Sequence, residues 1–311
     1  MEGFCLESVL EIKNVNKSFG RKKVLHDISF SVNEGEILGF IGPNGAGKTT
    51  TIKLVLGLQK IDSGEVFING QNIKTNFKAA MERVGAIVEN PDSYMYLTGM
   101  QNLKLIARLY KNITEKQILD IVELVGLKDR IHDKVSKYSL GMRQRLGIAE
   151  ALVNSPNLLI LDEPTNGLDP EGITELRNLL VELATKNKVA ILISSHNLAE
   201  LQNFCTNICI IQDGKIISSE SIKQMKHENA SKYFIELDKT DGVNQYLKEE
   251  DKILENNFIE VHREREEISD FVFELLKNKF KVYQVKENEK TLEQAFFERI
   301  GGDKNDKSNQ K

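Results

Sequence analysis

The sequence has no tryptophan, only five prolines among its 311 residues, and only three cysteines. Cys5, Cys205 and Cys209 are an odd number and contain no C-x-x-C pair, which fits a reducing compartment better than a disulfide framework. We therefore expect Cys205 and Cys209 to pack as small apolar residues rather than to bind a metal.

Long apolar runs are also missing. No stretch approaches the roughly 20 consecutive apolar residues that a membrane helix needs. The N-terminal sequence MEGFCLESVL has no basic region followed by a long apolar core. We expect a chain that neither spans a membrane nor carries an export signal. The net charge of -4 provides no overall field that would draw the chain to nucleic acid, so we expect no nucleic-acid partner.

The use of proline and glycine changes near residue 221. All five prolines and eighteen of the 21 glycines come before that point. We predict a domain over residues 9–221, an accessory α/β domain over 222–302 and a disordered tail over 303–311. In the accessory domain SKYFIELD, NNFIEVH and KVYQV have strand patterns, whereas ISDFVFELLKNKF and the closing segment TLEQAFFERI have helical ones.

The larger domain alternates apolar, β-rich runs with helical patterns. The runs are ILGFIG, LLILD, VAILISS and ICIIQDGKII. This alternation is typical of an α/β fold in which helices cover both faces of a mixed sheet, and such sheets place their sites at strand ends. Residues from about 92 to 155 show successive helical patterns and no strong strand, which predicts a helical subdomain inserted into the α/β core.

The strongest motif is GPNGAGKTT, which has the form G-x-x-x-x-G-K-T and lies between an apolar strand and a helical run. Glycines allow several backbone N–H groups to face one phosphate chain, and the positive end of the following helix points at the same anion. A chance glycine-rich turn is the alternative. We expect the lysine to reach the β- and γ-phosphates and the first threonine to bind magnesium. The candidate nucleotide-binding residues are Gly42, Pro43, Asn44, Gly45, Ala46, Gly47, Lys48, Thr49 and Thr50.

Two acids follow the apolar strand in NLLILDEP. Asp162 lies at the strand end, where it can bind magnesium, and Glu163 can accept a proton from a water that attacks the γ-phosphate. Capping carboxylates at an ordinary strand end are the alternative. The phosphate loop in the same chain favours the catalytic interpretation.

Between these motifs stands YSLGMRQRL, which resembles the signature sequence of ATP-binding cassette (ABC) proteins. The resemblance implies that Ser139 and Gly141 face the γ-phosphate held by an opposite subunit. A serine that only caps a helix is the alternative. Leu140 and Met142 depart from the usual glycine and glutamine of the signature, so contacts by these two positions are not carried over.

Further motifs follow in the order of the family. NGLD, which ends at Asp169, resembles the D-loop, and ISSH places His196 where the family senses the γ-phosphate. Phe19, in KSFG, stands where the family stacks an aromatic on adenine, with Val24 nearby; a core phenylalanine is the alternative. The resemblance implies a P-loop NTPase fold of the ABC type, with ATP and Mg²⁺ as ligands.

The resemblance also implies partners. The chain has one phosphate loop and one signature, whereas the family binds each ATP between the loop of one cassette and the signature of another, so a homodimer is expected. Separate transmembrane permease subunits would hold the pair at the inner, cytoplasmic face of the membrane. The accessory domain pairs the cassettes, regulates them or only covers the edge of the core, and no chemical spacing in it decides between these roles.

Glu89, in VGAIVENPDS, stands where the family normally has a glutamine that contacts magnesium and the attacking water. A carboxylate can bind the metal but cannot donate an amide N–H. A glutamate of an ordinary loop is the alternative. Together with YSLGM and the accessory domain, Glu89 resembles the bacitracin-resistance and lantibiotic-immunity branch of ABC exporters. Export of another drug, lipid or ion, a soluble ABC ATPase acting on DNA or ribosomes, and a regulator without turnover remain alternatives.

Overall fold

The computed structural model describes residues 8–89, 91–222, 232–248, 250–263 and 265–287. The chain forms two compact units, residues 1–220 and 221–311, which are described separately below. The closing helix predicted for TLEQAFFERI, the tail 303–311 and Cys5 lie outside the described residues.

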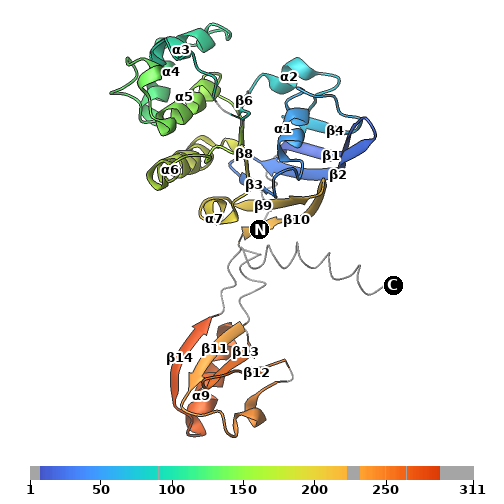
Figure 1. Ribbon diagram of the computed structural model, residues 1–311, viewed down its shortest axis with the longest axis vertical. Coiled ribbons are helices and arrows are strands. Elements are labelled where there is room, and N and C mark those ends of the chain that lie inside the picture. Colours follow the sequence, from blue (N-terminus) through green and yellow to red (C-terminus); the bar gives the residue numbers. More distant parts are fainter. Residues whose placement is uncertain (1–7, 90, 223–231, 249, 264, 288–311) are drawn as a thin grey trace, which may run out of the picture. The chain divides into compact units, whose positions relative to one another are not determined.

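A six-stranded sheet forms the centre of the first unit (Figure 1). In spatial order its strands are β10 (Lys215–Ser221), β9 (Asn207–Gln212), β3 (Ile37–Ile41), β8 (Ala190–Ser195), β7 (Leu158–Asp162) and β6 (Val84–Ile87). The five strands from β9 to β6 are parallel. Strands β3, β7 and β8 are buried at every residue, as expected for continuous apolar runs in a sheet covered on both faces.

Parallel pairing gathers the carboxyl ends of these strands at one edge of the sheet. Asp162 of β7 is opposite Ser194 of β8, and Ile87 of β6 is opposite Leu161 of β7. Segments that leave these strands therefore start side by side. Four helices accompany the two sheets of this unit: α1 (Lys48–Val55), α2 (Phe77–Met81), α6 (Pro170–Asn187) and α7 (Leu198–Leu201).

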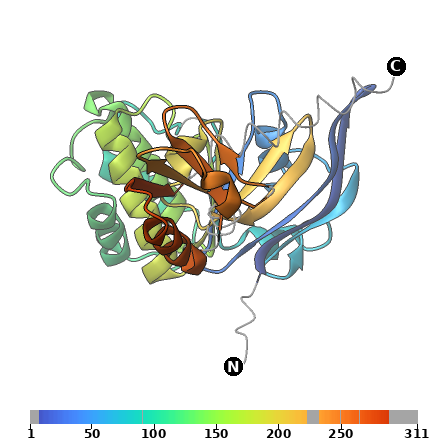
Figure 2. The same cartoon turned by 90° about the horizontal axis from the view of Figure 1, so that it is seen from below.

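A second sheet of the unit is antiparallel and has the order β2 (Lys22–Asn33), β1 (Ser8–Phe19), β4 (Ser63–Ile68) and β5 (Gln71–Asn72). Figure 2 shows the two long strands β1 and β2 side by side. Buried residues of both sheets, among them Ile12, Ile28, Phe40 and Ile160, form one hydrophobic core. The sequence analysis did not predict this sheet.

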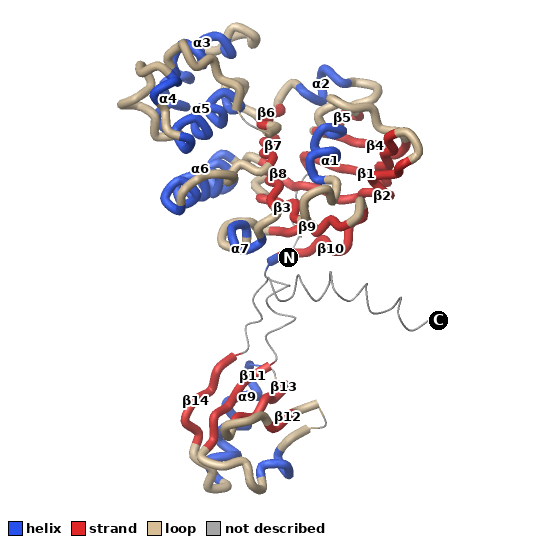
Figure 3. The backbone as a smooth tube through the Cα atoms, viewed as in Figure 1, coloured by secondary structure: helices blue, strands red, loops and turns tan. Residues whose placement is uncertain are grey.

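The helices of the segment 92–155 gather beyond β6 (Figure 3). They are α3 (Gly99–Ala107), α4 (Glu115–Leu124), the short 3₁₀ helix η1 (Val135–Lys137) and α5 (Leu140–Leu152). Thr98 and Thr114 open α3 and α4 with capping boxes, each completed by a glutamine three residues later. Each capping box satisfies backbone N–H groups at the start of its helix.

The described residues of the second unit form a four-stranded antiparallel sheet with one α-helix and one 3₁₀ helix. Its strands have the order β12 (Lys252–Ile253), β13 (Phe258–His262), β11 (Lys232–Leu237) and β14 (Val282–Glu287), with the 3₁₀ helix η2 (Val243–Tyr246) and the helix α9 (Arg265–Lys277). Alternate residues of β11 and β13 share a core with Phe271 and Leu275 of α9. Arg263 and Asp251 form a buried ion pair at 2.7 Å beside this core.

Cys205 and Cys209 are buried and free, as predicted. Burial raises the pKa of the Cys205 thiol far above its usual range and that of Cys209 to about 12. Among the described residues, no helix is both long and apolar enough to cross a membrane.

Candidate functional site

The loop between β3 and α1 requires glycine at three positions. A Cβ on Gly42 would lie 2.2 Å from the backbone oxygen of Ile211, and one on Gly47 would lie 2.5 Å from Leu25. Gly45 and Gly47 also have φ angles of 83° and 113°, which L-residues rarely adopt. The first turn of α1, which begins at Lys48, contains no acidic residue. This helix start can therefore bind an anion.

Lys48 links the loop to the end of β7. Its side chain is only 5% exposed. Its Nζ donates to the carbonyl oxygen of Gly42 at 2.7 Å and lies 3.1 Å from Oε1 of Glu163. The other carboxylate oxygen of Glu163 lies 2.7 Å from Nδ1 of His196. The structure therefore joins three residues that the sequence predicted from separate motifs.

Ser194 connects the two acids of β7 and was not among the predicted site residues. Its hydroxyl donates to Oδ1 of Asp162 at 2.6 Å and accepts the backbone N–H of Glu163 at 2.9 Å. Ser194 is fully buried, and Asp162 is 2% exposed. The two serines that end the apolar run VAILISS were the available signal, and Ser194 is the first of them. Its partners could not be identified without the pairing of β7 and β8.

Thr49 and Asp162 are two oxygen ligands expected for magnesium. Thr49 is partly buried on the first turn of α1, and the Asp162 carboxylate lies at the carboxyl edge of the sheet. One hydroxyl and one carboxylate fit a cation that takes its remaining ligands from water and substrate phosphates. Among the described residues, no three histidine, cysteine or acidic side chains cluster as a ready metal site.

Glu89 lies at the same edge, two residues beyond the end of β6. Its Oε1 accepts a hydrogen bond from Lys53 of α1 at 2.8 Å, which lowers the pKa of the Glu89 carboxyl below its usual value. The backbone of Glu89 is left-handed, with φ of 67°. The structure thus brings Glu89 to the helix of the phosphate loop and pairs it with a lysine.

Phe19 ends β1 and is 50% exposed, so the alternative of a core phenylalanine is wrong. The Lys17 ammonium lies 5.3 Å from the centre of its ring. The carbonyl oxygen of Val24 lies beside Gly47, 3.7 Å from the position that a Cβ would occupy there. Val24 therefore borders the loop, and Phe19 has ring surface to offer a ligand.

The signature residues lie apart from the loop. Ser139 is exposed and caps α5 by accepting the N–H of Met142, while Asp169 caps α6 by accepting that of Gly172. In Figure 1 the helical segment that carries α5 stands away from α1. A Cβ on Gly141 would contact the neighbour of Asp169, Leu168, at 3.8 Å. The signature and NGLD segments are thus close to each other but not to the phosphate loop of their own chain.

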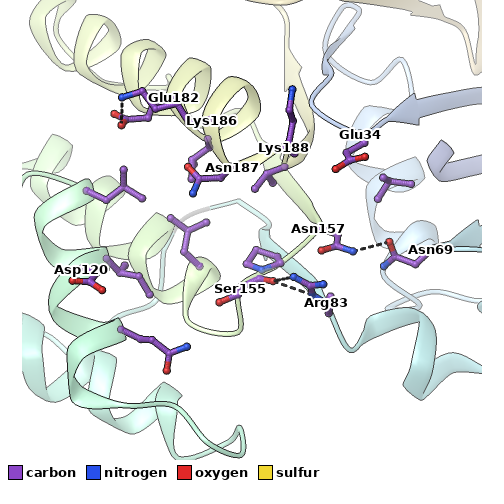
Figure 4. Close-up of a pocket in the computed structure, with 18 of the residues that line it drawn as sticks. Glu34, Asn69, Arg83, Asp120, Ser155, Asn157, Glu182, Lys186, Asn187 and Lys188 are labelled. Carbon is purple, nitrogen blue, oxygen red and sulfur yellow. Dashed lines mark hydrogen bonds and ion pairs between the residues drawn. The ribbon is translucent and has the colours of Figure 1, made fainter. Parts of the chain in front are cut away.

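A pocket of about 1160 Å³ lies elsewhere in the first unit (Figure 4). It lies at the amino ends of β6, β7 and β8, between α4 and the end of α6, and Arg83, Asn157 and Lys188 are among its lining residues. None of the predicted site residues lines it. The sequence motifs and this pocket therefore indicate different places in the first unit.

A strand–loop–helix phosphate cradle facing two acids at the end of a parallel strand defines a P-loop nucleotide-binding protein. Residues 25–166 match the family described as "ABC transporter". The uncharacterized ABC transporter ATP-binding protein YhcH of Bacillus subtilis is 44% identical over 95% of this chain and 97% of its own length. The bacitracin transport ATP-binding protein BcrA of Enterococcus faecalis is 36% identical over 96% of this chain and 98% of its own length.

A solved structure, titled as the ATP binding subunit of an ABC transporter, is also similar. It is 31% identical, has a TM-score of 0.64, and the match covers 71% of this chain and 93% of that one. The chain belongs to the ABC transporter ATP-binding proteins. It is an ATP-binding cassette and the ATPase subunit of a transporter, which confirms the predicted fold class and the resemblance to bacitracin cassettes.

Proposed function

We propose that this chain hydrolyses ATP to drive an exporter of peptide antibiotics of the bacitracin or lantibiotic type. The contact series from Lys48 through Glu163 to His196 supports the hydrolytic part of the proposal, because a lysine, a glutamate and a histidine are in contact at the carboxyl edge of the sheet. The cargo rests on the likeness to BcrA and on Glu89 at the usual glutamine position.

Each residue has a definite task in this proposal. The loop N–H groups and Lys48 bind the phosphates, and Glu163 accepts the proton of the attacking water. His196, whose Nδ1 contacts Glu163, orients that base through one ring nitrogen and has the other for the γ-phosphate. Thr49 and Asp162, with Glu89 nearby, would hold Mg²⁺, which neutralises phosphate charge when bound. Phe19 stacks on adenine, next to Val24.

A second copy of the chain completes the proposed site. The segment that carries α5 stands away from α1 in Figure 1, and the start of α5, with Ser139 and Gly141, suits the γ-phosphate held by a partner cassette. Asp169, at the start of α6, would lie at the same shared site. We expect a homodimer with two shared ATP molecules. Contacts of both subunits with the γ-phosphate would close this dimer, and hydrolysis would break those contacts.

An exposed apolar patch fits the separate permease. It comprises Tyr94, Met95, Tyr96, Leu109 and Tyr110, each at least 39% exposed. Leu109 and Tyr110 also line a cavity of about 290 Å³ that β6 and α5 share. Because β6 leads directly to Glu89, a protein bound here is mechanically connected to the ATP site. This patch would hold the cassette peripherally at the inner face of the membrane.

The ATPase proposal is tested with Glu163→Gln. The variant should bind ATP but release it slowly, so that ATP-loaded protein elutes as a dimer. Lys48→Ala should lose ATP binding or turnover. A Glu163→Gln protein that stays monomeric with ATP, or a Lys48→Ala protein with normal turnover, would contradict these assignments.

The cargo needs a cellular test. Cells that express the cassette together with the permease genes beside it should tolerate bacitracin or a lantibiotic better than cells with the Glu163→Gln cassette. Equal sensitivity of both strains across a panel of such peptides, with both proteins expressed, would contradict the cargo while leaving the ATPase assignment intact.

A further inference from the structure

Lys53 lies on the face of α1 that carries Thr49. The two residues are four positions apart, so their side chains follow one another along the helix, about one turn of ~5.4 Å apart. The Nζ of Lys53 is 2.8 Å from Oε1 of Glu89, and the two side chains are 30% and 66% exposed. A positive charge one helical turn after the candidate metal ligand Thr49 therefore pairs with the glutamate that replaces the family's glutamine.

Glu89 reaches this place because of the sheet register. Ile87 pairs with Leu161, so the segment after β6 leaves the sheet beside Asp162. The left-handed backbone at Glu89 turns the chain at this point, and the Lys53 contact fixes where the carboxylate lies. An unpaired carboxylate beside a triphosphate would repel it, whereas a neutral glutamine would not.

We propose that Lys53 is a positioning residue of the ATPase site, whose ammonium balances and orients the Glu89 carboxylate so that the pair acts as a neutral unit beside the bound triphosphate. The inference rests on the proposed function, because it assumes that ATP binds at the loop before α1. It extends that function by assigning a role to a residue that neither the motif nor its spacing identifies.

Loss of either charge alone should shift ATP affinity, in opposite directions. Lys53→Met leaves the carboxylate unpaired and should weaken ATP binding about two- to fivefold, as expected for a solvent-exposed charge pair. Glu89→Gln leaves the ammonium unpaired and, in the presence of a chelator that removes Mg²⁺, should tighten binding by a similar factor. The double variant should lie within about twofold of the natural protein, because the net charge beside the phosphates is again zero.

The measurement is ATP affinity of the full chain by titration calorimetry, with Mg²⁺ and with a chelator, at low and at high salt. Steady-state kcat and KM are recorded for the same proteins. Lys53→Arg keeps the positive charge and should therefore bind ATP with the affinity of the natural protein. Lys186→Met is the matched control, because Lys186 pairs with Glu182 at the same 2.8 Å near the far pocket and should leave ATP affinity unchanged. Lys53→Gln replaces Lys53→Met if that protein fails to fold.

The outcomes separate the two proposals. Opposite single effects that cancel in the double variant and shrink at high salt support the role of Lys53. If Lys53→Met weakens binding equally whether residue 89 is glutamate or glutamine, the pair does not act as a unit and the inference is overturned. Failure of the natural protein itself to bind ATP would instead refute the proposed function.

Discussion

Replacement of Ser194 by alanine would remove the hydroxyl that connects Asp162 to Glu163. In the natural chain this hydroxyl donates at 2.6 Å to the first acid and accepts at 2.9 Å from the backbone N–H of the second. Ser194 is fully buried, so water cannot readily replace either contact. Ser194→Ala should therefore destabilise the first unit and disturb both acids at once.

The size of the effect follows from the two contacts. A hydrogen bond to a charged group contributes about 1.5–3 kcal/mol and a neutral one about 0.5–1.5 kcal/mol, so the free energy of unfolding should fall by about 2–4 kcal/mol. For a unit of this length that corresponds to a decrease in Tm of roughly 4–16 °C. A shift of the proton acceptor by even a fraction of an ångström should lower kcat on the order of ten- to a hundredfold.

The neighbouring serine provides the control. Ser195 is 1% exposed on the same strand, and its hydroxyl bonds to the backbone of Asn197, not to the acids. Thermal unfolding is measured for Ser194→Ala and for Ser195→Ala. The ATPase rates of the two variants are then compared at a temperature below both unfolding transitions. Both variants should lose stability, but only Ser194→Ala should lose kcat out of proportion to folded protein. Equal ATPase rates in the two variants would refute the positioning role of Ser194.

Three further variants test other contacts. Gly42→Ala places a Cβ 2.2 Å from the oxygen of Ile211 and should abolish ATP binding measured by calorimetry, while a protein with normal affinity would contradict the loop geometry. Burial raises the pKa of Glu150, so its contribution favours folding below pH 4.5 and is lost as the pH rises through the higher folded value. Glu150→Gln should thus gain stability relative to the natural protein on going from pH 4.5 to neutrality, and an unchanged difference would contradict this. Arg263→Met leaves the buried Asp251 without its cationic partner, which should lower the free energy of unfolding of the second unit by about 3–5 kcal/mol. Hydrogen-exchange protection should fall in β11 and stay unchanged in β3. The same protection of β11 in the variant and in the natural protein would contradict this.

Much of the fold could be predicted because its central strands are unbroken apolar runs. Strands β3, β7, β8 and β9 correspond to ILGFIG, LLILD, VAILISS and the start of ICIIQDGKII. Such runs arise where both faces of a parallel sheet are covered. Strands β11, β13 and β14 and helix α9 of the second unit were also predicted, from strand patterns and from helical spacing in α9, whereas the two-residue strand β12 was not.

The antiparallel sheet was missed for a physical reason. β1 and β2 pair with several register shifts, as at Ile12 to Val15, so the inward residues do not follow a strict alternation. The burial of β1 runs irregularly along its length, and polar residues such as Asn14 and Asn16 interrupt its apolar pattern. A period-two search fails on such a strand, although its long-range pairing is extensive.

In the site, motif spacing identifies candidate residues, whereas strand pairing decides which of them are in contact. Motif order indicated Lys48 and Glu163, but their contact depends on the strand register and on the left-handed backbone of Glu163, with φ of 50°. Glu89 has the same unusual backbone at the end of the adjacent strand and contacts the other lysine of α1, Lys53. Helix α1 thus supplies two lysines, and each holds a glutamate at a sharp turn after a parallel strand. Non-glycine residues persist in this conformation when surrounding contacts fix them. The second of these pairs contains Glu89, which we propose stands in place of the family's glutamine.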